Sequence, residues 1–211
     1  MDQFIKENLV RIPNLNKEPL QYICEEIGLD KNSLLLEFGV YNGKSINYIS
    51  NFTTNTVYGF DCFNGLPEDW RPGHPKGEFD LSGNLPIVNN NVVLIKGYFQ
   101  ETLETFLKIT KKKISFIHID SDLYSSAIYI LNTVKPFLED SCIVVFDELV
   151  NFEYFEGTTS ELYAFYEFLS NNKDVKYEWI GMNGEVDLTY TKNVPGYYFY
   201  MGHSVAVRLF K

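Results

Sequence analysis

Short apolar runs alternate with amphipathic stretches along most of this chain. The runs are largely uninterrupted by polar residues, which is typical of strands covered on both faces of a parallel sheet. We therefore expect five such strands, at residues 34–38, 56–60, 92–95, 114–119 and 142–146. The end of the chain returns to β character, and two further strands are expected at residues 176–180 and 204–210.

The intervening stretches have the spacing of helices. Near the N-terminus, apolar residues recur at i, i+3, i+4 and i+7, and Thr158-x-x-Glu161 has the pattern of a capping box that opens a later helix. Helices are expected at residues 17–28, 44–52 and 124–136, and from residue 158 onward. This alternation predicts an α/β fold with an open, mostly parallel, Rossmann-like sheet and helices on both faces.

The chain is interpreted as a single domain, residues 1–211, because it contains neither internal repeats nor a Pro/Ser-rich linker. Residues 1–30 are expected to form an N-terminal helical segment. The longest stretch without periodicity is residues 62–91, where Gly and Pro recur. A loop of this length inside a compact domain is usually functional, and this one follows the second strand. We predict a substrate or lid loop that is mobile without ligand.

Charge and cysteine content restrict the possible partners. The chain has 28 acidic and 18 basic residues and a formal net charge of −10. Nucleic acids and anionic membranes require Lys/Arg patches, so neither is expected as a partner. The three cysteines form no CxxC pair and the N-terminus has no apolar signal segment, which favours a cytoplasmic location. A homo-oligomer is compatible with the sequence.

The segment from Glu37 to Ser45, EFGVYNGKS, reads as a strand end, a glycine turn and a helix start. A dinucleotide turn, GxGxxG, requires a second glycine where Tyr41 stands. A phosphate loop requires four residues between Gly39 and the Gly43-Lys-Ser group, but the chain has three. The carboxylate of Glu37 would also repel a triphosphate, whereas a cationic, methionine-type cofactor would favour an acidic turn.

A second acid supports this interpretation. Asp61 ends the second expected strand, 24 residues after Glu37. An acid at this position can accept hydrogen bonds from ribose hydroxyls, as in dinucleotide-binding folds. Each acid alone is a weak signal, but the two acids with a glycine turn between them indicate a nucleoside-containing cofactor.

The chain resembles the class I S-adenosylmethionine-dependent methyltransferases, and more narrowly the macrocin O-methyltransferase family. The matching segments cover about half of the chain: EFGVYNGKS, YGFDCFNGLPEDW, KGYFQETL, HIDSDLYSS and VVFDE. The resemblance implies that the glycine turn holds the amino-acid part of the cofactor, Asp61 the ribose and residues 97–99 the adenine. The expected cofactor-binding residues are Glu37, Phe38, Gly39, Tyr41, Gly43, Ser45, Asp61, Phe63, Gly97, Tyr98 and Phe99.

The same resemblance implies a divalent metal, usually Mg²⁺, at Asp120, Asp147 and Glu148. Carboxylates that converge from neighbouring strand ends suit such a hard cation, which would activate a hydroxyl for methylation. The general base is left open between Asp120, the expected catalytic residue, and a solvent contact of the bound hydroxyl. The implied acceptor is a small molecule with a hydroxyl group, and the family association suggests a sugar or glycan.

Alternative interpretations compete for some residues. Asp122 could be a metal ligand, but capping of the following helix is favoured. His118 is interpreted as a satisfied strand histidine rather than a base. At the level of the whole chain, the alternatives are a nucleoside-triphosphate hydrolase using GxxxGKS and VVFDE, or a binding module without catalysis. A chance placement of acids is disfavoured, because four of them stand at the carboxyl ends of successive expected parallel strands: Glu37, Asp61, Asp120 and Asp147. These acids should meet at one crevice.

Overall fold

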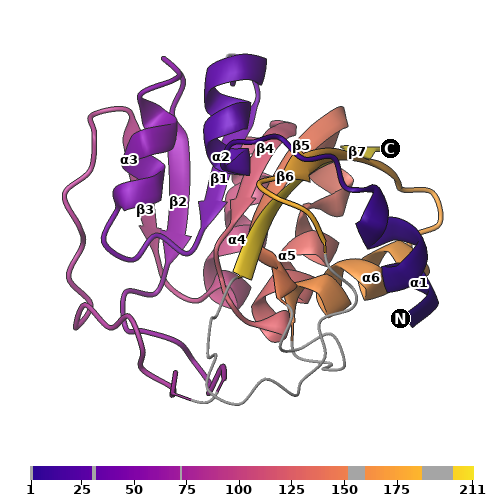
Figure 1. The fold of residues 1–211 in the computed structure, drawn as a ribbon. Coiled ribbons are helices and arrows are strands. Elements are labelled where there is room, and N and C mark those ends of the chain that lie inside the picture. Colours follow the sequence, from indigo (N-terminus) through magenta and orange to yellow (C-terminus); the bar gives the residue numbers. More distant parts are fainter. Residues whose placement is uncertain (1, 30–31, 72, 152–159, 187–201) are drawn as a thin grey trace.

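Seven strands form one sheet in the order β3-β2-β1-β4-β5-β7-β6 in the computed structural model, which describes residues 2–29, 32–71, 73–151, 160–186 and 202–211 (Figure 1). β7 pairs antiparallel with both β5 and β6, whereas the other pairings are parallel, so the sheet is mostly parallel. The strands are β1 (Leu34–Phe38), β2 (Val57–Asp61), β3 (Val92–Lys96), β4 (Ile114–Ile119), β5 (Leu138–Asn151), β6 (Lys176–Met182) and β7 (Gly202–Phe210).

Helices cover both faces of this sheet. The longer ones are α4 (Phe99–Thr110), α5 (Tyr124–Val134) and α6 (Glu161–Asn171), and the shorter ones are α1 (Asp2–Asn8), α2 (Pro19–Tyr22) and α3 (Lys44–Ser50). A π-helical segment, Ile23–Ile27, continues α2, and 3₁₀ turns occupy Leu9–Arg11 and Lys135–Phe137. The predicted open α/β sheet, with helices on both faces, is therefore confirmed (Figure 1).

The core has two layers because successive strand residues point to opposite faces. Leu34, Leu36 and Phe38 of β1 pack with buried side chains of α1, α4, α5 and α6. Leu35 packs on the other face, with buried residues of α3 and of the segment that follows α2. All five β1 side chains are buried, which explains why four of the five residues are apolar.

Strand β5 is longer than its apolar run. The sequence placed a strand at residues 142–146, so that Asp147 would follow its end, but β5 spans Leu138–Asn151. Its parallel pairing with β4 ends at Phe146, and antiparallel pairing with β7 carries it on to Asn151. Asp147 and Glu148 therefore lie within the strand, at the point where β4 has already ended.

Two helix predictions need correction. Helix α6 begins at Glu161 with Ser160 as its cap, whose hydroxyl accepts a hydrogen bond from the Tyr163 amide, so the Thr158-x-x-Glu161 box does not mark its start. Residue 158 lies outside the described residues. Helix α4 was not predicted, although buried Leu103 and Leu107 lie one turn apart on it.

Candidate active site

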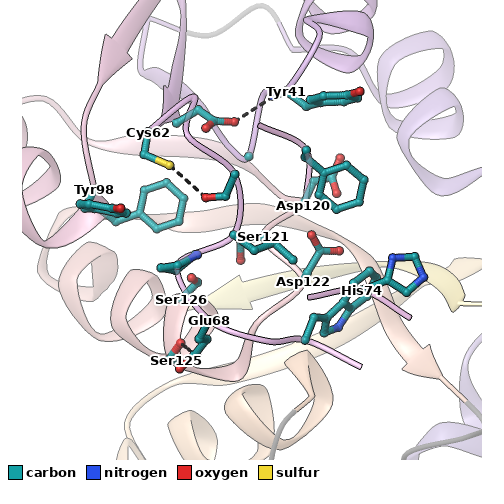
Figure 2. Close-up of a pocket in the computed structure, with 18 of the residues that line it drawn as sticks. Tyr41, Cys62, Glu68, His74, Tyr98, Asp120, Ser121, Asp122, Ser125 and Ser126 are labelled. Carbon is teal, nitrogen blue, oxygen red and sulfur yellow. Dashed lines mark hydrogen bonds between the residues drawn. The ribbon is translucent and has the colours of Figure 1, made fainter. Parts of the chain in front are cut away.

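A cavity of about 490 Å³ opens at the carboxyl edge of the parallel strands. The segments that follow β1, β2, β3 and β4 contribute to its wall, as does β5 (Figure 2). Another side of it is lined by several described residues between Gly65 and Phe79, among them Trp70, Arg71 and His74. The site therefore forms where parallel α/β sheets usually bind ligands.

The turn after β1 is held in place by the acid of β2. The backbone amides of Val40 and Tyr41 each donate to Asp61 Oδ2 at 2.8 Å, and the Phe63 amide donates to Asp61 Oδ1 at 2.7 Å. Gly39 has a φ of +87°, and a Cβ at this residue would lie 1.7 Å from the Asp120 carbonyl oxygen. Only glycine fits this approach, which fixes the turn against the end of β4.

Glu37 is fully buried beneath the turn, and the cavity lining does not include it. It pairs with His118, whose Nδ1 lies 2.9 Å from Glu37 Oε1. This contact follows from the parallel register, which places Glu37 opposite His118. Burial tends to lower the pKa of His118, but the Glu37 carboxylate, with Asp120 and Asp147, raises that pKa to about 9.

Asp120 and Asp147 meet because β4 and β5 are in register one residue before each of them, at Ile119 and Phe146. One ligand atom from each carboxylate and a nitrogen of His118 lie within 4.8 Å of one another. Burial, reinforced by the charge of Asp147, raises the pKa of Asp120 well above its usual value. Of the four acids expected at one crevice, Asp61, Asp120 and Asp147 line the cavity, whereas Glu37 is buried outside its lining.

Asp122 and Glu148 extend this acidic group along the cavity wall. Burial raises the pKa of Asp122 to about 7, with contributions from Glu148 and Asp147. Burial likewise raises the pKa of Glu148 to about 7, against the lowering effect of Arg71, whose guanidinium lies 3.5 Å away. Each carboxyl is thus partly protonated near neutral pH in the absence of a bound cation.

The capping role favoured for Asp122 is wrong. The cap of α5 is Leu123, and no side chain caps this helix end. Asp122 instead has a left-handed backbone, with a φ of +61°, and lines the cavity. The Leu123 amide bonds to the Ser121 carbonyl in a tight turn, which takes the Asp122 side chain out of the helix start.

Glu161 belongs to the same acidic surroundings, and sequence reasoning missed it as a site residue. It lies at the first position of α6 and is 2% exposed. Neither carboxyl oxygen has a hydrogen-bond partner among the described residues. Burial raises its pKa well above the usual value, as do the charges of Asp122 and Glu148. No local pattern marks Glu161 as a site residue, because it stands more than ten residues after Glu148 and approaches the site only through tertiary packing.

The segment predicted as a lid, residues 62–91, forms one wall of the cavity, with residue 72 outside the description. The guanidinium of Arg71 lies 3.6 Å from the centre of the Trp70 ring and pairs with Glu148. Further along α5, Ser125 donates a hydrogen bond to Glu68 (Figure 2). The segment is thus linked to both β5 and α5. Arg71 was not expected from the sequence.

Most predicted site residues line the cavity. These are Gly39, Tyr41, Asp61, Gly97, Tyr98, Phe99, Asp120, Asp147 and Glu148. The others lie behind it: Glu37, Phe38, Gly43, Ser45 and Phe63 are absent from the lining. Phe38 belongs to the core, where its ring stacks on Phe60 at 5.1 Å. Contact of each residue with a cofactor stays a prediction.

The chemistry of this cluster suits a divalent cation. Four carboxyls line one part of the cavity, at Asp120, Asp122, Asp147 and Glu148. Arg71 pairs with Glu148, and His118 lies 3.9 Å from Asp147. Nε2 of His118 is buried without a hydrogen-bond partner among the described residues. Hard divalent cations take oxygen ligands, and such a cation would relieve the repulsion among these groups.

The structure is similar to those of known methyltransferases. CalS11, a calicheamicin methyltransferase, superposes with a TM-score of 0.57 and 19% identity, covering 89% of this chain and 74% of that one. An O-methyltransferase from Bacillus cereus in complex with SAH superposes with a TM-score of 0.56 and 14% identity, covering 100% of this chain and 96% of that one. A putative rRNA-methylase from Clostridium thermocellum superposes with a TM-score of 0.53 and 16% identity, covering 95% of this chain and 98% of that one. At these identities the likeness establishes the fold.

A comparison with curated protein sequences finds no match. The family model described as a methyltransferase domain matches residues 36–149, which is more than half of the chain. The matched region runs from β1 into β5 and contains the glycine turn, Asp61 and the acidic residues of β4 and β5. The chain therefore belongs to the methyltransferase-domain family and has the class I fold of S-adenosylmethionine-dependent methyltransferases.

Proposed function

We propose that this protein transfers a methyl group from S-adenosylmethionine to a hydroxyl oxygen of a small molecule. One observation carries the proposal: the turn held by Asp61 and the carboxyls of β4 and β5 open into the same cavity. The cofactor's sulfonium and ammonium charges would be stabilised by these carboxyls. Family membership supports methyl transfer, and the acids supply the setting for a hydroxyl acceptor.

In the proposed reaction, the acceptor oxygen attacks the methyl carbon as the carbon–sulfur bond breaks. The products are S-adenosylhomocysteine and a methyl ether, and the hydroxyl proton passes to a base. Asp61 would hold the ribose while residues 97–99 border the adenine. Much of the rate would come from orientation of the oxygen in line with the sulfonium. Asp120 is the proposed catalytic carboxylate.

Asp120, Asp147 and Glu148 would hold a divalent cation, with Mg²⁺ as the expected ion. When bound, such a cation lowers the pKa of a coordinated hydroxyl. Asp147, whose side chain is 48% exposed, faces solvent and leaves room for an acceptor. Glu148 is tied to Arg71 in the structure, so it would have to exchange that partner to act as a direct ligand.

We infer that the acceptor is a sugar hydroxyl. Trp70, Tyr41 and Tyr98 supply aromatic surface on the wall, which suits the apolar faces of a sugar ring. The net charge of −10 argues against RNA as the substrate. The narrower likeness to the macrocin O-methyltransferases points to the same acceptor class and stays a prediction.

Location is a further part of the proposal. Cys24, Cys62 and Cys142 are free thiols in the structure, which fits a reducing compartment such as the cytoplasm. Among the described residues, the helices are too short and too polar to cross a membrane.

The proposal is tested by calorimetric titration with S-adenosylhomocysteine and, in parallel, with ATP, each with and without Mg²⁺. We expect S-adenosylhomocysteine to bind and ATP to give no signal, because family membership argues against the nucleoside-triphosphate hydrolase. The Asp61→Asn variant should weaken S-adenosylhomocysteine binding at least about tenfold, whereas Asp147→Ala should keep it. Binding of ATP alone would overturn the proposed function.

A further inference from the structure

His118 is a buried polar group at the edge of the acidic cluster. Its side chain is 1% exposed, and it lies on β4 two residues before Asp120. Residues two apart on a strand share a face, so His118 lies below Asp120 on the side where Asp147 also projects. A buried polar group in such a position needs partners for both ring nitrogens.

One ring nitrogen has its partner. Nδ1 lies 2.9 Å from Glu37 Oε1, and Glu37 is fully buried. A carboxylate can only accept, so Nδ1 must carry a proton that it donates to Glu37. A bound cation would displace the proton on Nε2, and in the neutral imidazole that results Nε2 is the atom with the free lone pair.

The other ring nitrogen faces the carboxyls. Nε2 has no hydrogen-bond partner among the described residues, and it lies 3.9 Å from Asp147 Oδ1, too far for a hydrogen bond. One ligand atom from each of His118, Asp120 and Asp147 lies within 4.8 Å of the other two. A cation with bonds of about 2.1 Å places opposite ligands about 4.2 Å apart, so small side-chain adjustments would close this set around it.

We propose that His118 is a direct nitrogen ligand of the divalent cation, oriented by Glu37, and that the site therefore prefers Mn²⁺ and other transition-metal ions to Mg²⁺. Imidazole binds first-row transition metals well, whereas Mg²⁺ takes oxygen ligands and water. Histidine ligands usually donate their second N–H to a carboxylate, which is the role of Glu37 here. The inference rests on the proposed metal site and replaces its expected ion.

The first test uses Mn²⁺ as the probe and the metal-stripped full chain. Pulsed electron paramagnetic resonance on the Mn²⁺-loaded protein should show hyperfine coupling to one imidazole nitrogen. Labelling histidine with ¹⁵N should change this coupling, which identifies the ligand without any substitution. Titration calorimetry should show Mn²⁺ binding at least about tenfold tighter than Mg²⁺.

Variants then assign the nitrogen. The chain has three histidines, and His74 also lines the cavity, so His74→Gln is a matched control for His118→Gln. His118→Gln should abolish the coupling and weaken Mn²⁺ binding at least tenfold, while changing Mg²⁺ binding much less. Glu37→Gln should keep the coupling and weaken Mn²⁺ binding about 10–100-fold, as expected for a residue that positions a ligand. His74→Gln should change neither quantity.

The outcomes separate this inference from the proposed function. Mn²⁺ binding without nitrogen coupling, or coupling lost in His74→Gln instead, would overturn the role of His118 and leave a carboxylate site intact. An absence of any divalent-metal binding would overturn the metal site and this inference with it. Methyl transfer itself is judged separately, by the binding of S-adenosylhomocysteine.

Discussion

The contact between Gly39 and Asp120 offers a sharp test of how the two halves of the site are joined. A Cβ at residue 39 would lie 1.7 Å from the Asp120 carbonyl oxygen and 2.7 Å from its carbonyl carbon. Both obstructing atoms belong to the backbone, so no side chain can turn aside. Substitution Gly39→Ala would have to separate the ends of β1 and β4 by roughly 1.5 Å to restore ordinary contact.

The cost follows from three effects. An L-residue in the left-handed region costs about 1–2 kcal/mol. Overpacking adds about 1–3 kcal/mol, and the displacement would strain the 2.8 Å hydrogen bond from the Asp120 amide to the Phe38 carbonyl. We expect Gly39→Ala to lose about 4 kcal/mol or more of unfolding free energy, equivalent to about 8–16 °C in Tm.

Gly77→Ala is the matched control, because Gly77 has the same φ of +87° but nothing within 4 Å of its Cβ position. It should lose only the backbone term, about 1–2 kcal/mol. Urea unfolding of both variants measures the difference. If Gly39→Ala does not fold while Gly77→Ala does, the reasoning stands, and equal losses in the two variants would refute it.

Three further predictions follow. In divalent-free buffer, the free energy of unfolding, measured by urea unfolding, should fall as pH rises from about 4 to about 8. Burial raises the folded-state pKa of Asp122 and Glu148 to about 7. The folded protein therefore holds protons that the unfolded chain releases. At pH 8 in the same buffer, Glu161→Gln should increase stability by about 1–3 kcal/mol. The neutral amide removes the cost of keeping a proton on this carboxyl, whose pKa burial raises well above its usual value. In the free protein, amides of residues 62–91 should exchange hydrogen faster than those of β1 and β4.

Each of these has its own check. The loss of stability should continue to about pH 9, because the folded-state pKa of His118 is raised as well. A rise in stability between about pH 4 and about pH 8 would contradict the raised pKa values. Glu104→Gln, at an exposed position of α4, serves as the control for Glu161→Gln and should lower stability only slightly, because exposed ion pairs such as Glu104–Lys108 contribute little. Amide protection of residues 62–91 equal to that of the central strands would show that this wall is rigid without ligand.

The central strands were predictable because their signal is local. The bounds of β1 and β4 agree with their apolar runs to the residue, since both strands are buried on both faces and every position must be apolar or paired. Glu37 and His118 interrupt these runs, and they are buried as a pair. The signal of α4 was also local, and it was overlooked.

The sequence by itself also determined which acids follow parallel strands, and hence that Asp61 and Asp120 share one edge of the sheet. It could not determine the length of β5, because the extension past Phe146 depends on pairing with β7, more than fifty residues later. Nor could it determine which carboxyls become buried. Desolvation of Asp122 and Glu161 is created by packing between β4, β5, α6 and residues 65–79, segments that are distant along the chain.

The contact of His118 with Glu37 illustrates the same division. Each residue lies at a predictable position on its own strand, but only the register between β1 and β4 places them side by side. Register is set by the pairing of backbones and by the fit of both faces, which no single segment encodes. Local patterns thus supplied the residues of the site, and the tertiary structure decided which of them meet, which are buried and which face the cavity.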